Sequence, residues 1–285
     1  MKRIIDELIE KCKKLGPICI GIDPRLEYIP SIIKGNPIER ILSFSEKILK
    51  ALEGSAPAVK VNIAFFEPFG PEGIDAFFYI LKLAKEVGFI TIADVKRGDI
   101  GYSSELYAKA YLENPHIDFI TVNPYFGEDG LIPFVKLCKK NNKGLFILCK
   151  TTNPSSIQIQ DRKANGKLIY EIVAEIAERL GKDLIGKYGF SSIGIIAGAT
   201  FPEQLKKLRE KFPSLFFLVP GFGAQGGKPE DIIYAFNEEG IGAIISSSRR
   251  IIFAYRYKGY PEREFTGAAK EAVKEMRESI LKVLG

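Results

Sequence analysis

The stretch ITIADVKRGD, residues Ile90–Asp99, joins a short apolar run to two acids and a lysine in the spacing Asp-x-Lys-x-x-Asp. The β-branched apolar half predicts a buried strand. Because side chains alternate along a strand, Asp94 and Lys96 are expected to point to the same side of its end. Asp99 follows in the loop and can bring a second carboxylate back to this lysine. A lysine held between carboxylates stays protonated, so the stretch predicts a placed proton donor.

Similar apolar runs recur along the chain and alternate with longer amphipathic stretches, which is typical of repeated βα units. Strands are predicted at Ile18–Ile22, Ala58–Ile63, Phe89–Ala93, Phe119–Val122, Leu145–Cys149, Ser192–Ile196, Phe216–Val219 and Ala243–Ser246. Helices are predicted at Ile38–Leu52, Gly73–Glu86, Ser104–Glu113, Leu131–Asn141, Leu168–Tyr188, Pro202–Lys211, Pro229–Phe236 and Gly267–Leu284. This alternation predicts an α/β fold, a closed (β/α)8 TIM barrel, and the alternative is an open doubly wound sheet of fewer strands. No composition break divides the chain, so residues 1–285 are expected to form a single domain.

The composition of the 285 residues is that of a soluble globular protein, with 46% hydrophobic and 27% charged residues. The net charge of +6 is spread along the chain, and no basic block with interleaved aromatic residues predicts nucleic-acid binding. No apolar stretch reaches membrane-spanning length, and Asp6, Glu7 and Glu10 argue against a signal peptide. The four cysteines match no zinc or Cys-x-x-Cys motif, which favours reduced thiols and a cytoplasmic location. The single histidine, His116, excludes a histidine-based metal site.

Polar residues gather directly after the predicted strands. They lie at Asp23–Arg25, Lys60, Asn62, Asp94–Asp99, Asn123, Lys150–Asn153, Pro220–Gly227 and Ser246–Arg250. In a TIM barrel the carboxyl ends of all strands meet at one face, and that face carries the active site. The sequence therefore predicts one site that is built from several strand ends.

The loop Pro220–Gly227 is rich in glycine, so its backbone N–H groups can approach an anionic ligand closely. It leads into the helix predicted from Pro229, and phosphate groups bind well to such N–H-lined turns. Arg249, after the neighbouring strand, could hold the same phosphate through paired hydrogen bonds, and Arg250 follows it directly. Barrels commonly bind phosphate at their last two strands, which favours a phosphate site over a glycine-rich turn that serves packing alone.

Lys60 lies within the apolar run Ala58–Ile63, where a lysine is unusual unless acids face it. Asp23, Asp94 and Asp99 could supply those acids. The alternatives are a lysine that extends from the strand to solvent, or a salt-bridge network with a purely structural role. Because buried charges are costly, an alternating array of lysines and aspartates favours a functional role.

Several fragments of the chain resemble the orotidine 5'-phosphate decarboxylase family, in its longer bacterial and archaeal branch. The family's Asp-x-Lys-x-x-Asp signature stands at Asp94, Lys96 and Asp99, and its preceding lysine stands at Lys60. Further similar fragments are Lys60–Glu67, Thr121–Tyr125, Leu148–Pro154, Gly198–Glu203 and the phosphate clamp of Pro220–Gly227 with Arg249. The resemblance runs from Ile18 to Arg250, which is nearly the whole predicted barrel.

The resemblance implies decarboxylation of orotidine 5'-monophosphate to uridine 5'-monophosphate in de novo pyrimidine biosynthesis, without a metal or an organic cofactor. It assigns Lys96 as the proton donor to C6 and places Asp94 beside the substrate carboxylate. Lys60 and Asp99 would hold Lys96 charged and aligned. The substrate-binding residues that it implies are Asp23, Asn123, Thr152, Pro220, Gly221, Gly223, Gln225 and Arg249. It also implies a homodimer with shared active sites, in which Asp99 serves the site of the other subunit.

Other functions are kept as alternatives. A related barrel that acts on a sugar phosphate would share the Asp-x-Lys-x-x-Asp signature but bind magnesium through an additional acid. The fragment Lys150–Pro154 favours the nucleotide substrate over that alternative. A catalytically silent phosphate-binding barrel would not require all the charged residues of the signature. Nothing in the sequence favours a structural or nucleic-acid-binding protein.

Overall fold

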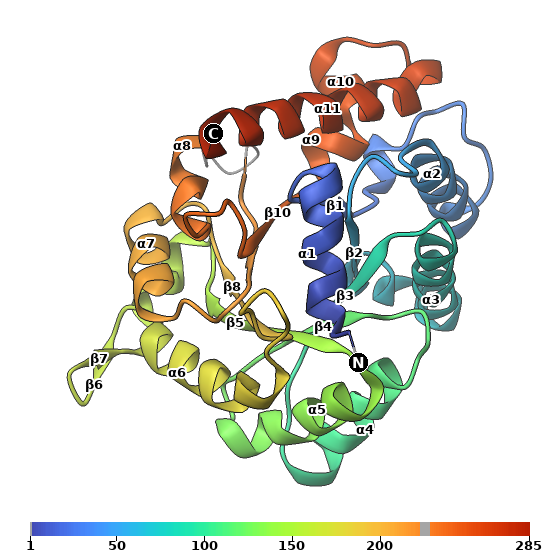
Figure 1. Ribbon diagram of the computed structural model, residues 1–285. Helices are drawn as coiled ribbons and strands as arrows, with labels where there is room; N and C mark the ends of the chain where they lie inside the picture. The colour runs from blue at the N-terminus through green and yellow to red at the C-terminus, as the bar shows by residue number, and fades with distance from the viewer. Residues whose placement is uncertain (1, 223–228) are drawn as a thin grey trace.

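The structure is a computed structural model that describes residues 2–222 and 229–285. Within these residues, eight parallel strands close into a barrel in the order β1, β10, β9, β8, β5, β4, β3, β2, with helices around the outside (Figure 1). The barrel strands are β1 (Ile18–Ile22), β2 (Ala58–Asn62), β3 (Ile90–Arg97), β4 (Phe119–Val122), β5 (Gly144–Lys150), β8 (Ile193–Ala197), β9 (Phe217–Val219) and β10 (Ala243–Ser247). The closed barrel confirms the predicted fold and rules out the open doubly wound sheet.

The helices follow the predicted alternation with the strands. They are α1 (Ile4–Leu15), α2 (Pro37–Ala51), α3 (Gly70–Glu86), α4 (Gly101–Leu112), α5 (Glu128–Asn141), α6 (Ile169–Gly181), α7 (Pro202–Lys211), α8 (Pro229–Ile232), α9 (Arg249–Ile252), α10 (Ala254–Lys258) and α11 (Phe265–Leu284). Local sequence signals explain where some of them begin. For example, Asn36 caps α2 by accepting a hydrogen bond from the Glu39 N–H, and Pro37 occupies the first helical position.

The connection between β5 and β8 differs from the prediction at two points. No strand or helix is predicted between Cys149 and Leu168, but the structure forms a short hairpin there. Its strands are β6 (Lys163–Ala164) and β7 (Lys167–Leu168). The helix predicted to reach Tyr188 ends at Gly181. A 3-10 turn over Lys182–Leu184 follows it, and the Gly181 carbonyl accepts a hydrogen bond from the Ser191 hydroxyl (2.9 Å).

The region around β10 also differs from the prediction. The helix predicted over Pro229–Phe236 is a short α8 followed by a 3-10 turn over Ile233–Ala235. The Ala235 carbonyl accepts a hydrogen bond from the Arg209 guanidinium (3.0 Å), which replaces the next bond of a regular helix. After β10 the chain forms α9 and α10, which the apolar pattern does not reveal because both helices are short.

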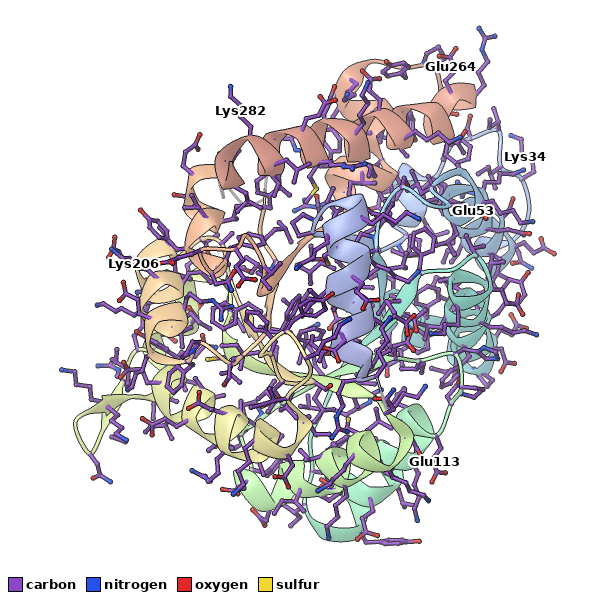
Figure 2. The ribbon with its side chains drawn as sticks, viewed as in Figure 1. Lys34, Glu53, Glu113, Lys206, Glu264 and Lys282 are labelled. Carbon is purple, nitrogen blue, oxygen red and sulfur yellow. The ribbon has the colours of Figure 1, made fainter. Side chains whose placement is uncertain are left out.

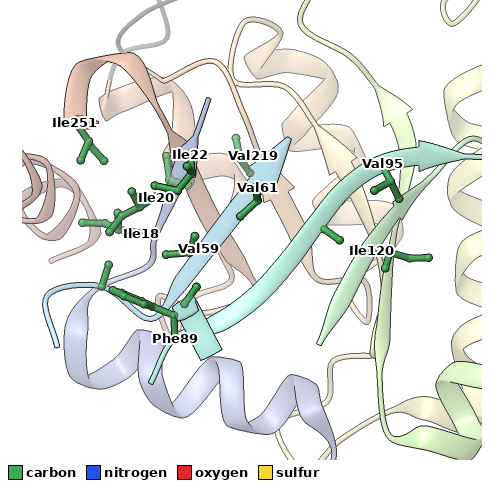
Figure 3. Close-up of a cluster of buried hydrophobic side chains, with 14 of the residues drawn as sticks. Ile18, Ile20, Ile22, Val59, Val61, Phe89, Val95, Ile120, Val219 and Ile251 are labelled. Carbon is green, nitrogen blue, oxygen red and sulfur yellow. The ribbon is translucent and has the colours of Figure 1, made fainter. Parts of the chain in front are cut away.

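Two apolar layers hold the barrel together. Alternate strand residues such as Ile18, Ile20 and Val59 point outward and pack against the surrounding helices (Figure 3). The residues between them point inward, and at the amino ends of the strands they pack against one face of α1, as Ile5 and Leu8 show. In Figure 1 α1 lies across the centre of the barrel. It closes this end, so the opposite end is the one open to a ligand.

Charged side chains lie on the outside of the ring of helices. Exposed examples labelled in Figure 2 are Lys34, Glu53, Glu113, Lys206, Glu264 and Lys282. Across the described part of the chain, no helix combines the length and the apolar character that crossing a membrane requires.

Candidate active site

Lys60, Asp94 and Lys96 meet inside the barrel at the carboxyl ends of its strands. Lys60 lies between Val59 and Val61, whose side chains point outward to the helices (Figure 3), so alternation turns Lys60 inward. The Lys60 ammonium nitrogen lies 2.6 Å from Asp94 Oδ2. The Lys96 ammonium nitrogen lies 2.7 Å from Asp94 Oδ1. One buried carboxylate therefore binds two lysines, one through each oxygen.

Electrostatics keep the inner members of this cluster ionised. Burial alone would raise the pKa of Asp94, but the ammonium groups of Lys60 and Lys96 hold that pKa well below its ordinary value. Burial works to lower the pKa of Lys60, yet the carboxylates of Asp94 and Asp23 outweigh burial and raise it. The Asp94 side chain is 6% exposed, whereas that of Lys96 is 47% exposed. Lys96 is thus the member of the cluster that faces the open end of the barrel.

β3 is distorted where it carries the site. It was predicted to end at Ala93, but it continues to Arg97. In pairing with β4, β3 advances four residues, from Ala93 to Arg97, while β4 advances two, from Ile120 to Val122, so β3 bulges. Within the bulge Lys96 has a φ of 45°. That left-handed conformation costs a residue other than glycine about 1–3 kcal/mol, and it persists only where surrounding contacts enforce it.

Asp99 is not brought to Lys96 within the chain. Its Oδ1 accepts a hydrogen bond from the Ile100 N–H (2.8 Å), and its main-chain carbonyl accepts one from the Ser104 hydroxyl (2.5 Å). In the ranges that the structure covers, Lys96 pairs with Asp94 and not with Asp99. The expectation that Asp99 returns to the lysine of its own chain is therefore not met, and its role in a second subunit stays a prediction.

Three of the residues expected to bind substrate line the same end of the barrel. Asp23, directly after β1, has a buried Oδ1 without a hydrogen-bond partner in the part of the chain that is described. Asn123, after β4, is exposed, and its Oδ1 accepts a hydrogen bond from the Tyr125 N–H (3.0 Å). Thr152, after β5, packs closely on Gly198, where a Cβ would lie 2.6 Å from the Thr152 methyl carbon. Of these three residues, Asp23 is the one with a buried acceptor that no described residue uses.

The expected phosphate loop is described only at its start. Pro220 and Gly221 follow β9, and Gly221 has a φ of 96°, a conformation that favours glycine. Gly223 and Gln225 lie outside the described residues, as does the rest of the stretch 223–228. The predicted contribution of this loop therefore stays a prediction.

Arg249 and Arg250 differ in their surroundings. Arg249 is half-buried at the first position of α9, and its guanidinium has no hydrogen-bond or ion-pair partner among the described residues. Arg250 is exposed, and its guanidinium lies over the ring of Tyr257, 5.0 Å from the ring centroid. This arrangement leaves Arg249 available to an anion and favours it over Arg250.

Thr121, on β4, is a site residue that the sequence-based prediction lacks. Its fully buried hydroxyl donates a hydrogen bond to Asp94 Oδ1 (2.9 Å) and accepts one from the Lys96 N–H (2.9 Å). The only signal in the sequence is its inward position, two residues after the inward-facing Phe119. A threonine within an apolar run is also common in ordinary strands, so that signal is weak.

Lys150, at the end of β5, is a second inward-facing residue, which the sequence places among the polar strand ends without a role of its own. Its side chain is 1% exposed, and its nitrogen lies 2.9 Å from Asp161 Oδ1 and 2.9 Å from the Ser156 hydroxyl. The same nitrogen lies 4.0 Å above the ring of Phe201, which follows β8. Lys150 thus joins the loop after β5 to the loop after β8.

Across the described residues, no three His, Cys, Asp or Glu side chains are grouped so that they could hold a metal ion.

Comparison with known proteins assigns the chain to a family. Residues 16–258 match the model of the Orotidine 5'-phosphate decarboxylase / HUMPS family. The orotidine 5'-phosphate decarboxylase of Clostridium perfringens strain 13 is 39% identical over 287 residues, covering 98% of this chain and 100% of that protein. The enzyme of the same name from Clostridium novyi strain NT is 40% identical, covering 98% of this chain and 99% of the relative. The solved structure of Leishmania donovani OMP decarboxylase has a TM-score of 0.79 and 30% identity, covering 99% of each chain. These findings confirm the resemblance, and the chain belongs to the orotidine 5'-phosphate decarboxylase / HUMPS family.

Proposed function

We propose that this protein decarboxylates orotidine 5'-monophosphate to uridine 5'-monophosphate, with Lys96 as the proton donor to C6. The observation that carries the proposal is Asp94, buried at the open end of the barrel and bound to Lys60 on one side and Lys96 on the other. The curated relatives that are about 40% identical over nearly the whole chain carry the decarboxylase name, which favours this branch of the family over sugar-phosphate chemistry.

In the proposed reaction the bond between C6 and the carboxylate breaks, carbon dioxide leaves, and the electron pair remains at C6. Lys96 then transfers an ammonium proton to C6, and its nearly half-exposed side chain can take up a new proton from water. The Asp94 carboxylate would lie beside the substrate carboxylate, where repulsion between like charges favours loss of carbon dioxide. Before and during the transfer, the Lys96 ammonium stabilises the negative charge that develops at C6.

The remaining substrate contacts are those that the family resemblance implies. Asp23, with its unpartnered Oδ1, and Lys60 would bind ribose hydroxyl groups. Thr152 and Asn123 would contact the nucleotide from the loops after β5 and β4. Pro220, Gly221, Gly223 and Gln225 would bind the phosphate together with Arg249. Binding energy from such a remote phosphate can assist the chemical step, because it holds the reacting carbon against Lys96.

The direct test measures the ultraviolet absorbance of orotidine 5'-monophosphate mixed with purified protein and excess chelator. Formation of uridine 5'-monophosphate at the same rate as in the absence of chelator would support a decarboxylase that needs no divalent metal. If nothing happens in chelator and a sugar phosphate turns over once magnesium is restored, the protein belongs to the metal-dependent alternative.

We also propose that two copies of the chain form a dimer in which Asp99 completes the partner's active site. Asp99 is surrounded by exposed apolar side chains that a lone subunit would leave in water, including Ile100 (58% exposed) and Tyr102 (68% exposed). Leu106 and Tyr107 line a surface hollow of about 310 Å³ beside Asp99. An interface over this patch would bury the apolar groups and carry Asp99 to a second subunit.

Subunit mixing tests the shared site. Lys96→Ala and Asp99→Ala subunits are each expected to be nearly inactive as pure proteins. After they are mixed, the heterodimer holds one site with both an intact Lys96 and the partner's intact Asp99, so activity should return. If Asp99 serves its own subunit, no site in the mixture is complete and activity stays absent.

We also propose that the chain folds as a single domain and that the protein is cytoplasmic. The barrel draws its strands from residues 18–247, which supports one domain for most of the chain. Cys12, Cys19, Cys138 and Cys149 are all free and buried, which supports a reducing compartment. Limited proteolysis that leaves one resistant fragment of nearly full length would support the single domain.

A further inference from the structure

The regular backbone hydrogen bonding between β3 and β4 is interrupted around Lys96. Pairing between β3 and β4 is regular up to Ala93 and resumes at Arg97, whose carbonyl accepts a hydrogen bond from the Asn123 N–H (2.8 Å). The Lys96 N–H lies between these two points, in a partly buried position. A backbone N–H that is partly withdrawn from water is unfavourable without an acceptor, so this group needs another partner.

Thr121 supplies that partner through its side chain. Its hydroxyl oxygen lies 2.9 Å from the Lys96 nitrogen and accepts the hydrogen bond that the strand ladder would otherwise provide. Its hydroxyl proton is donated to Asp94 Oδ1, also at 2.9 Å. The same Asp94 oxygen binds the Lys96 ammonium group at 2.7 Å. The three residues therefore form a closed ring that joins the Lys96 backbone to the end of its own side chain.

This ring accounts for the strained conformation of Lys96. At a φ of 45° the lysine backbone is in a region that residues other than glycine rarely adopt. If the N–H had no fixed acceptor, the backbone could relax to a negative φ and the side chain would turn away from Asp94. A threonine hydroxyl suits this position, because it can accept and donate at once and its β-branched side chain has few rotamers.

We propose that Thr121 is a positioning residue for the proton donor: its hydroxyl bridges the Lys96 backbone and the Asp94 carboxylate, and so directs the Lys96 ammonium to the reacting carbon. This inference rests on the proposed decarboxylase function. Thr121 acts through Lys96 and Asp94 and does not itself exchange a proton with substrate. Its loss should therefore slow the chemical step and leave the phosphate-binding side of the site unaffected.

The test compares Thr121→Val, which keeps the shape and removes the hydroxyl, with Thr121→Ser, which keeps the hydroxyl. We expect Thr121→Val to lower kcat by about 100-fold, as misplacement of a reacting group by about 1 Å can do, with KM unchanged. Thr121→Ser should recover most of the loss. Thr121→Cys, whose thiol is a weak acceptor, should behave like Thr121→Val and replaces it if the valine variant does not fold.

Thr91→Val is the matched control. Thr91 is equally buried on β3, but its hydroxyl lies at the other end of the barrel, where it donates to the His116 carbonyl (2.7 Å) and lies 3.2 Å from Asp118 Oδ2. This variant should lower the thermal midpoint without changing kcat. A Thr121→Val protein with wild-type kcat, or with KM and kcat impaired together and no rescue by serine, would overturn the proposal.

A crystal structure of the Thr121→Val protein separates this inference from the proposed function. We expect Lys96 to relax to a negative φ and its ammonium to leave Asp94. If the wild-type protein does not convert orotidine 5'-monophosphate, the proposed function fails, but the structural comparison still tests the positioning role. An unchanged Lys96 in that variant would show that the hydroxyl does not hold it.

Discussion

Each end of the barrel contains a buried aspartate that binds a lysine and a threonine, and the two clusters differ in how they treat the backbone. At the amino end, Asp118 binds the Lys85 ammonium through both oxygens, each at 2.7 Å. Oδ2 of Asp118 also accepts hydrogen bonds from the Thr91 N–H (3.0 Å) and the Thr91 hydroxyl (3.2 Å). These contacts lie within regular β3 pairing and involve no strained residue.

At the carboxyl end, Asp94 binds two lysines, and one of them has a strained backbone that interrupts the sheet. Here the Thr121 hydroxyl accepts the hydrogen bond of the Lys96 N–H, which in regular pairing between β3 and β4 would go to a backbone carbonyl. The amino-end cluster thus pairs its charges without backbone strain, as expected of a salt bridge that only stabilises the fold. The carboxyl-end cluster keeps an ammonium group at a fixed, half-exposed point, and strain retained in this way is typical of functional sites.

The largest expected effect comes from removing the exposed lysine of the carboxyl-end cluster. Lys96→Ala should lower turnover of orotidine 5'-monophosphate by at least about 10⁴-fold, because both the proton donor and the charge facing C6 are lost. The thermal midpoint should stay close to that of the wild type, because the replaced side chain is nearly half exposed and Asp94 keeps its ion pair with Lys60. Initial rates and a thermal melt of the same preparation measure both quantities. Substantial residual activity would contradict the assignment of Lys96 as proton donor.

Lys85→Ala is the counterpart at the amino end. It leaves Asp118 buried without its cation, so we expect a loss of stability of about 3 kcal/mol and an unchanged kcat. Urea unfolding and steady-state kinetics would measure the two effects. If Lys85→Ala lowers kcat as strongly as Lys96→Ala does, the two ends of the barrel are not functionally distinct.

Local sequence patterns predict the barrel well, because each strand and helix is encoded by neighbouring residues. The alternation of ITIADVKRGD correctly indicates that Asp94 and Lys96 share a side of β3. The bulge could not be predicted in this way, since it depends on Thr121, which lies far along the chain. The same limit applies to the end of α6, where the Gly181 carbonyl accepts a hydrogen bond from the hydroxyl of Ser191, a residue beyond the helix.

The expected position of Asp99 illustrates a different limit. Spacing along the chain allows its carboxylate to return to Lys96, but the local contacts with Ile100 and Ser104 hold it elsewhere. A sequence motif records which residues occur together, and it does not specify whether they meet in one subunit or across two. Subunit mixing is the measurement that separates those possibilities.

A smaller effect, on KM, is expected from Arg249, whose guanidinium has no partner among the described residues. Arg249→Ala should raise KM by about 100-fold, because charge-assisted hydrogen bonds to a phosphate contribute about 1.5–3 kcal/mol each. Arg250→Ala is the matched control, since its guanidinium already contacts Tyr257, and it should leave KM unchanged. Steady-state kinetics on both variants measure the two KM values. The reverse result would move the phosphate contact to Arg250.

The smallest expected effect is in the pH dependence of stability, where the carboxyl-end cluster should change nothing over the working range. The pKa of Asp94 is held below its unfolded value, so its stabilisation is present above about pH 4 and is lost as the pH falls through the folded value. The pKa of Lys60 is raised, so its stabilisation is present below about pH 10 and is lost as the pH rises further. Between these limits the cluster's contribution should be constant.

Comparing the wild type with Asp94→Asn at several pH values tests this expectation. The difference between their thermal midpoints should be constant from about pH 5 to about pH 9 and should shrink only in stronger acid, where the wild-type carboxylate becomes protonated. A difference that already shrinks near pH 6 would mean that Asp94 titrates in the neutral range, as an aspartate does when burial outweighs its cations. In that case the two lysines do not hold Asp94 as an anion, and the carboxyl-end cluster would lose the charge pattern that distinguishes it as a candidate site.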